Sequence, residues 1–134
     1  MAQSSFLRGC LASAALTLGA LAPVATVHAH HTFVTKYDGA KLITISGVIS
    51  SVSYSNPHIF FQVSATAKSG NQVTWTVETE GILAARGKGL TEALLKDGAK
   101  VSVSGWVGRD GGAELGLKSI TVGGKTIQMR NTAR

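Results

Sequence analysis

The chain is almost free of cysteine. Of its 134 residues only Cys10 carries a thiol, and Cys10 lies in an N-terminal segment with the features of an export leader. Without a cysteine after residue 29, disulfides, thiolate metal sites and cysteine nucleophiles are excluded from the rest of the chain. The sequence also lacks a Gly-x-Ser-x-Gly nucleophile elbow and a phosphate-binding glycine loop ahead of a helix. Because few candidate catalytic groups remain, we expect a binding protein rather than an enzyme.

Long runs of one charge are absent as well. The chain has 13 basic residues, of which Arg8 lies in the leader, and 7 acidic residues, so the part after residue 29 carries a net charge of +5. The basic residues are scattered and are not grouped with aromatic side chains, as a groove for single-stranded nucleic acid requires. We therefore expect a solubilising surface and no nucleic-acid partner.

Residues 1–29 have the features of a secretory signal peptide. Arg8 precedes an apolar run from Cys10 to Leu21, and Val27-His28-Ala29 places small or moderate side chains at the positions that signal peptidase reads. The run is shorter than the roughly 20 residues that span a bilayer. We expect cleavage after Ala29, a periplasmic or secreted location, and one domain without a transmembrane span in residues 30–134.

The apolar pattern predicts an all-β fold. Period-two alternation marks five strands and a short sixth one, at 42–54, 59–65, 73–79, 100–107, 114–122 and 125–129. A short helix is expected at 82–86, between strands three and four, and Thr91 is a suitable N-cap for another at 92–96. This order is that of an OB-fold-like barrel of five to six strands. Another small barrel or sandwich is the rival interpretation, because a strand count does not fix topology.

Some segments of the predicted barrel are irregular. In the first strand the apolar residues change parity at Gly47, which predicts a bend or bulge there. The fifth strand changes parity between Leu117 and Ile120. Residues 32–37 read as an extended arm, and the tail from residue 130 is expected to be frayed.

Three histidines remain after the leader: His30, His31 and His58. Cleavage after Ala29 would give His30 a free α-amine, so its amine and its ring could chelate one metal ion. A third nitrogen, from His31 or His58, would complete a nitrogen-rich set of the kind that favours Cu(II). One extra N-terminal residue would turn the amine into an amide and abolish the chelate. The sequence thus favours an exported copper-binding protein.

A metal-free binding module is the alternative. Its ligand would be a small molecule, a glycan or a periplasmic protein, held by a face with at least one exposed aromatic side chain. The expected binding residues are Tyr54, Asn56, His58, Phe60, Gln62 and Glu78, with Arg86 or Arg109 at the rim. Glu78 and Glu80 share strand parity and could form a carboxylate pair, although two carboxylates near a strand end are more often simply solvated.

A series of short motifs runs along the chain after the leader. They are His30-His31-x-Phe33, Ile45-Ser46-Gly47-Val48-Ile49, Tyr54-Ser55-Asn56-Pro57-His58, the Trp75 strand ending in Glu78, Leu83-x-x-Arg86-Gly87 followed by Leu90, Asp97-Gly98-x-x-Val101, and Gly105-x-x-x-Arg109-Asp110-Gly111. On these motifs the chain resembles an uncharacterised family of small exported bacterial proteins, described only as a domain of unknown function. His-His and Asn-Pro-His are the most specific parts of the resemblance. It implies a periplasmic location and a small β-barrel, and it implies no activity.

Overall fold

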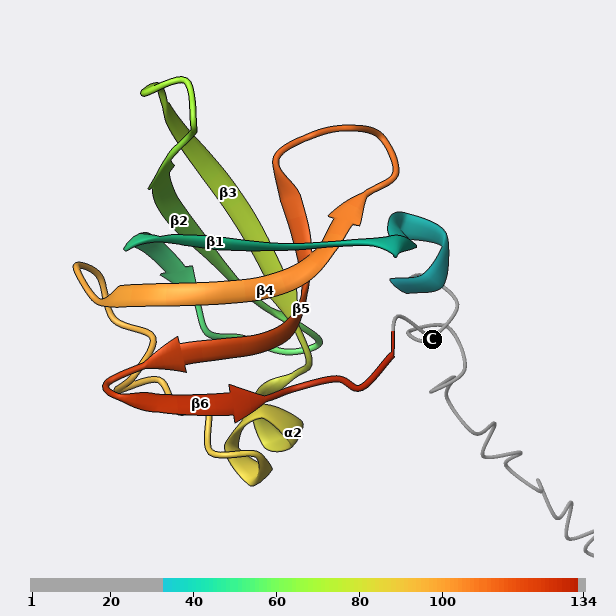
Figure 1. Ribbon diagram of the computed structural model, residues 1–134. Coiled ribbons are helices and arrows are strands. Elements are labelled where there is room, and N and C mark those ends of the chain that lie inside the picture. The colour runs from blue at the N-terminus through green and yellow to red at the C-terminus, as the bar shows by residue number, and fades with distance from the viewer. Residues whose placement is uncertain (1–32, 133–134) are drawn as a thin grey trace, which may run out of the picture.

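The computed structural model describes residues 33–132, which form six strands, a short helix and an N-terminal helical turn (Figure 1). The turn, residues 33–36, leads directly into the first strand. The elements that follow are β1 Tyr37–Ser53, β2 Ile59–Thr66, β3 Gln72–Thr79, α2 Ile82–Gly87, β4 Lys100–Gly108, β5 Glu114–Val122 and β6 Lys125–Gln128. No helix in this described range is long and apolar enough to cross a membrane. The expected leader, His30 and His31 lie outside the described residues.

The strands close into a barrel. Their order in the sheet is β3-β2-β1-β4-β5-β6, and a parallel pairing of β3 with β5 joins the two sides of the sheet into a ring. The long β1 pairs with β4 along its first part and with β2 along its second part, so it takes part in both sides. With α2 between β3 and β4, this is the predicted OB-fold-like barrel, and the expected fold class is confirmed.

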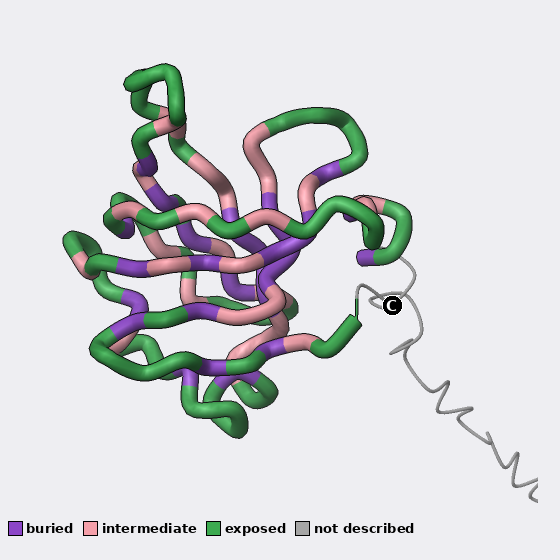
Figure 2. Tube along the Cα trace, viewed as in Figure 1, coloured by how far each residue is buried: buried purple, intermediate pink, exposed green. Residues whose placement is uncertain are grey.

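The interior follows the predicted alternation. In β2, the side chains at odd positions from Ile59 to Ala65 are buried, whereas Phe60 and Gln62 face outward. Figure 2 shows buried positions alternating with more exposed ones along the strands, while the β2–β3 hairpin tip and the loop at 109–112 are exposed. Alternation of this kind places one apolar face of each strand toward a common core.

The bend in β1 lies beyond Gly47. The β1–β2 register shifts between Ile49 and Ser51, and burial changes parity there, from the buried Ile49 to the half-buried Val52. The bulge was therefore predicted at the wrong residue, since it lies between Ile49 and Ser51 and not at Gly47. Gly47 serves close strand packing instead, because a Cβ at this residue would lie 2.2 Å from the Ser64 carbonyl oxygen.

Two other expectations have opposite outcomes. The parity change in β5 is confirmed, since the β4–β5 register shifts where Ser104 pairs with Ser119 and Gly105 with Leu117. The helix expected at 92–96 is absent from the described chain, where the segment forms turns. Leu95 in this segment is nevertheless buried and contributes to the core.

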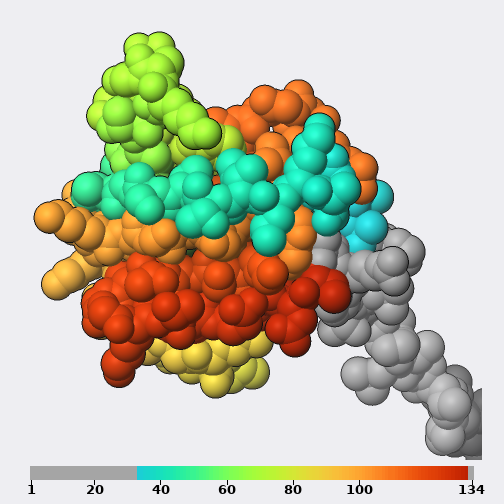
Figure 3. Space-filling view, in the orientation of Figure 1, coloured from blue at the N-terminus to red at the C-terminus, as the bar shows by residue number. Residues whose placement is uncertain are grey.

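The N-terminal helical turn replaces the predicted extended arm. Phe33, Tyr37 and Trp106 form a small buried cluster apart from the main core, and the rings of Phe33 and Tyr37 lie 4.5 Å apart. Figure 3 shows the turn packed beside the β4–β5 loop, to which the Lys36 carbonyl is joined by a hydrogen bond from the backbone N–H of Arg109. Burial of these aromatic side chains therefore holds residues 33–36 against the barrel. A search for alternating apolar residues does not detect such packing.

The C-terminal segment returns to the N-terminal turn. The guanidinium of Arg130 lies 4.0 Å from the centroid of the Phe33 ring, and its side chain is only 12% exposed. The expectation of a frayed tail is wrong for this residue. Cation–π contact and burial hold the chain beyond β6 against the residues that precede β1.

Candidate functional site

A buried carboxylate lies at the end of β3. Glu78 is 6% exposed, although the strand pattern puts it on the outer face with Thr76. Lys36 and Tyr37 contribute side chains that contact Glu78 at this end of the barrel. The interpretation of Glu78 as a solvated carboxylate is therefore wrong, because a distant part of the chain supplies the burial.

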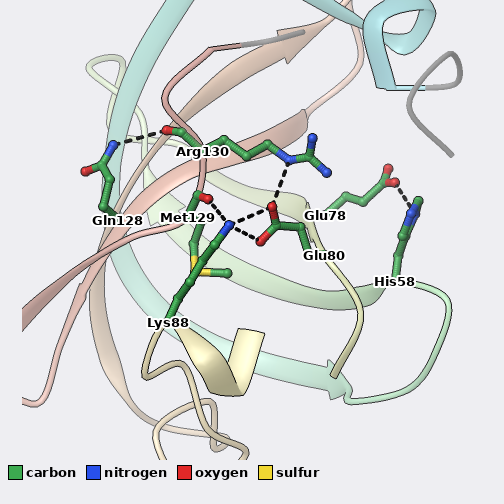
Figure 4. A network of polar contacts seen from close by, with 7 residues as sticks. All are labelled: His58, Glu78, Glu80, Lys88, Gln128, Met129 and Arg130. Atoms are coloured by element: carbon green, nitrogen blue, oxygen red, sulfur yellow. Dashed lines mark hydrogen bonds and ion pairs between the residues drawn. The ribbon is translucent and has the colours of Figure 1, made fainter. Parts of the chain in front are cut away.

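Three side chains from different parts of the chain converge on Glu78. Its Oε2 atom accepts hydrogen bonds from the Tyr37 hydroxyl at 2.7 Å and from Lys36 Nζ at 3.0 Å. Its Oε1 atom lies 2.7 Å from Nδ1 of His58, as Figure 4 shows. Each carboxylate oxygen thus has at least one donor, which offsets the cost of burying the charge.

These contacts keep the carboxylate ionised. Burial opposes ionisation of Glu78, but the hydrogen bonds from Tyr37 and Lys36 and the nearby positive charge lower its pKa below the ordinary value. Burial and the bond to Glu78 raise the pKa of Tyr37, so the phenol stays protonated and donates. Burial of Lys36 opposes its charge, but Glu78 and Glu114 raise its pKa. In this cluster a neutral phenol and a charged ammonium both donate hydrogen bonds to an ionised carboxylate.

The contact with Glu78 orients the His58 ring. An ionised carboxylate only accepts hydrogen bonds, so the bond requires a proton on Nδ1 of His58. In the neutral ring this leaves the lone pair on Nε2. The His58 side chain is 20% exposed, and its ring centroid lies 6.4 Å from that of Phe60. The contact therefore holds the His58 ring in one orientation, with Nδ1 toward Glu78.

Charges of both signs lie around Glu78. Lys36 Nζ lies 3.0 Å from Glu78 and 3.1 Å from Glu114, so one ammonium is shared by two carboxylates. The guanidinium of Arg130 adds a second positive charge that acts on Tyr37, the other donor to Glu78.

The structure brings together only part of the predicted binding face. His58, Phe60 and Glu78 are neighbours, as expected. Phe60 is half-buried and lies under Lys36 Nζ, which is 5.8 Å from the ring centroid. His58, Phe60 and Glu78 are therefore the predicted binding residues that the structure places together.

The other predicted binding residues have other contacts. The Tyr54 hydroxyl donates to the Leu90 carbonyl at 3.1 Å and the ring packs against the main core, so Tyr54 supports the fold. Asn56 Oδ1 accepts the backbone N–H of Ile82 at 2.9 Å, which satisfies a free donor at the start of α2. For these two residues the structure assigns a contact that stabilises the fold.

Both predicted rim arginines are exposed. Arg86 lies in the last turn of α2, and its guanidinium is not part of the Glu78 cluster. Arg109 lies in the β4–β5 loop, and its Nε donates to the Val34 carbonyl at 3.4 Å. Arg109 therefore lies beside the N-terminal helical turn, whereas Arg86 is not brought to the His58 site.

Glu80 belongs to a second network and does not form a carboxylate pair with Glu78. Figure 4 shows Glu78 pointing to His58, whereas Glu80 points to Lys88. Lys88 Nζ lies 2.8 and 2.7 Å from the two Glu80 oxygens and donates to the carbonyl of Met129. Arg130 Nε lies 3.9 Å from Glu80. This network ties the end of β3 to the C-terminal segment.

Sequence reasoning missed three residues of the site: Lys36, Tyr37 and Glu114. No local signal identifies them, because they become partners of Glu78 only after the N-terminal helical turn and β5 meet β3. Between residues 33 and 132 no group of three or more His, Cys, Asp or Glu side chains is arranged to hold a metal ion.

Comparison with known proteins gives a structural neighbour and a family. The chain is similar to the mitochondrial single-stranded DNA binding protein Rim1 from S. cerevisiae, with 15% identity and a TM-score of 0.46 over 68% of this chain and 97% of that one. The curated proteins include no match. The model of the family of unknown function DUF6152 matches residues 18–128, which is well over half of the chain. The chain therefore belongs to the family of unknown function DUF6152.

Proposed function

We propose that this protein is an exported, periplasmic copper-binding protein. Its Cu(II) site combines the α-amine and ring of His30 with a ring nitrogen of His31 and Nε2 of His58. The observation that carries the proposal is the 2.7 Å contact between Nδ1 of His58 and Glu78. Histidines that bind metals almost always donate their second ring N–H to such a partner, which fixes the tautomer and makes the other nitrogen a better ligand.

Chain connectivity supports the participation of His30 and His31. They precede Phe33 by only three and two residues, and an extended chain spans about 3.5 Å per residue. Phe33 is buried against Tyr37, whose hydroxyl contacts the same Glu78 that orients His58. The chain therefore allows His30 a reach of about 10 Å and His31 a reach of about 7 Å from the Phe33 backbone.

The chemistry of the donor atoms supports Cu(II). Four nitrogen donors in a tetragonal set favour Cu(II) over the other common divalent ions. Because the amine and imidazoles must be unprotonated to bind, affinity falls as the pH is lowered.

The proposal makes export a condition of binding. A leader attached to His30 converts the amine nitrogen into an amide, so the chelate forms only in the processed protein. The site then exists outside the cytoplasm, where it would serve in copper handling or delivery.

A titration of the processed protein with Cu(II), in competition with a chelator and followed by electron paramagnetic resonance, tests the proposal. The matched control carries one additional N-terminal residue. We expect one-to-one, nitrogen-rich binding that collapses in the extended protein. Weak binding, or binding that the extension leaves unchanged, overturns the proposal.

The second candidate function is metal-free binding of a small ligand, a glycan or a protein partner at the same face. It is favoured by the half-buried Phe60, which lies beside His58 on the outside of β2. Substitution of Phe60 by alanine separates packing from binding. A loss of stability indicates packing, and a loss of ligand at unchanged stability indicates binding.

A further inference from the structure

A groove runs beside the Glu78 cluster on the outer side of the barrel. It has a volume of about 240 Å³ and lies across β1, β2 and β3. Its lining consists of Ser51, Ser53, Phe60, Phe61, Gln62 and Thr76. None of the proposed metal ligands lines the groove. The groove meets them only at Phe60, which lies beside His58.

The strand register explains why these side chains gather. Ser51 of β1 pairs with Gln62 of β2, and Gln62 in turn pairs with Thr76 of β3. Residues directly opposite one another in neighbouring strands present their side chains on the same face of the sheet. Ser53 and Phe60 form the adjacent pair. The groove is therefore a short row of hydroxyl and amide groups with an aromatic ring at one end.

The hydrogen-bonding groups in this row are available. Within the described chain, the side chains of Ser51, Gln62 and Thr76 make no hydrogen bond to another protein group. The Ser53 hydroxyl has one such contact, with the Ser55 hydroxyl at 3.2 Å. Hydroxyls donate and accept, and an amide offers two donors and an acceptor, so the row can pair with a ligand that has both kinds of group.

The groove lining carries no ionisable side chain. The cation over the Phe60 ring is the ammonium of Lys36, which is already paired with Glu78 and Glu114. An anionic ligand would find no free cation in the lining, and an oligonucleotide requires a basic track along its backbone. The chemistry therefore selects a neutral, hydroxyl-rich ligand.

We propose, as a narrowing of the second candidate function on which it rests, that this groove binds one ring of a neutral saccharide. The hydroxyls of the sugar pair with Gln62, Ser51 and Thr76, and an apolar face of the sugar rests on Phe60. The volume lies below the roughly 300–1,000 Å³ of sites for drug-sized ligands, which fits a single ring better than a longer buried segment. The face of strands two and three is also where OB-type barrels bind oligonucleotides and oligosaccharides, and the uncharged lining favours the latter. The site is independent of copper.

The test uses ¹⁵N-labelled processed protein kept free of metal with EDTA. Maltotriose and tri-N-acetylchitotriose are the neutral saccharide probes, and a thymidine pentanucleotide is the nucleic-acid probe. We expect at least one saccharide to shift the Gln62 side-chain amide and the backbone amides of Phe60 and Thr76. Gln62→Ala is expected to weaken that saccharide about tenfold, the factor that a lost hydrogen-bond partner of ordinary strength gives.

The matched control is Gln128→Ala, which removes an exposed glutamine from β6, outside the groove. It is expected to leave the saccharide titration unchanged. The inference is overturned if neither saccharide shifts the groove at about 10 mM, a concentration that detects millimolar affinity. It is also overturned if only the pentanucleotide binds, or if Gln62→Ala and Gln128→Ala behave alike. Because no metal is present, these outcomes are separate from those of the copper titration.

Discussion

The hydroxyl of Tyr37 donates a 2.7 Å hydrogen bond to Glu78 and thereby joins the first residue of β1 to the end of β3. The same carboxylate contacts Nδ1 of His58, just ahead of β2, through its other oxygen. One buried side chain therefore links the N-terminal helical turn to the residue that we propose as a metal ligand. This link makes the chemistry of His58 depend on residues that precede the barrel.

Replacing Glu78 with glutamine is expected to lower the free energy of unfolding at neutral pH by about 2 kcal/mol, because Tyr37 and Lys36 lose a charged acceptor. The pKa of Glu78 in the folded protein lies below the ordinary value of 4.5, so its contribution is present above that value. The contribution disappears as the pH falls through the folded pKa. Urea denaturation of both proteins at neutral pH and at about pH 3 measures the effect.

The exposed Glu92 provides the control. Glu92→Gln is expected to change the free energy of unfolding by less than about 0.5 kcal/mol at either pH. A stability difference between the wild type and Glu78→Gln that stays constant down to the acidic condition would contradict the assigned role of the carboxylate.

The barrel could be predicted from the sequence because its strands are amphipathic. Ile59, Phe61 and Val63 alternate with polar or partly exposed neighbours, and α2 begins at Ile82 as expected. Such patterns are local, so a single chain displays them directly. The bulge in β1 was misplaced because Gly47, which permits a bulge, serves close packing against Ser64.

The site could be predicted only in part because its key contacts are distant in sequence. His58 and Glu78 attracted attention as chemical groups, but their contact depends on the pairing of β2 with β3. The partners Lys36 and Tyr37 lie some 40 residues from Glu78, in a segment whose helical turn is imposed by aromatic packing. Propensity alone does not report such tertiary effects.

Gly116→Ala is expected to displace the N-terminal helical turn. A Cβ at Gly116 would lie 2.3 Å from Cζ of Phe33 and 2.8 Å from Cδ2 of Tyr37, so the aromatic cluster must shift. Overpacking of this kind costs about 1–3 kcal/mol, which urea denaturation will detect. Gly87→Ala in α2, where a Cβ meets nothing within 4 Å, is the matched control and should be neutral or slightly stabilising. Equal effects of the two substitutions would refute the packing assignment.

Asn56→Ala is expected to destabilise the protein by about 1 kcal/mol, the usual effect of removing a side-chain acceptor from a helix start. The lost contact is the 2.9 Å bond from the Ile82 backbone N–H. Thermal denaturation of Asn56→Ala, with the exposed hairpin substitution Asn71→Ala as control, measures the effect. If Asn56→Ala keeps full stability while it abolishes binding of copper or a saccharide, Asn56 is a ligand-binding residue after all.

Pulsed electron paramagnetic resonance of the wild type and of His58→Ala counts the imidazole nitrogens that coordinate Cu(II) in the processed protein. We expect the variant to lose one coordinated imidazole and to bind copper at least about tenfold more weakly, the lower end of what a lost ligand or its supporting partner costs. Gln62→Ala, which changes only the neighbouring groove, should retain the wild-type spectrum. Identical spectra and affinities for the wild type and His58→Ala would show that His58 is not a ligand and would contradict the central claim.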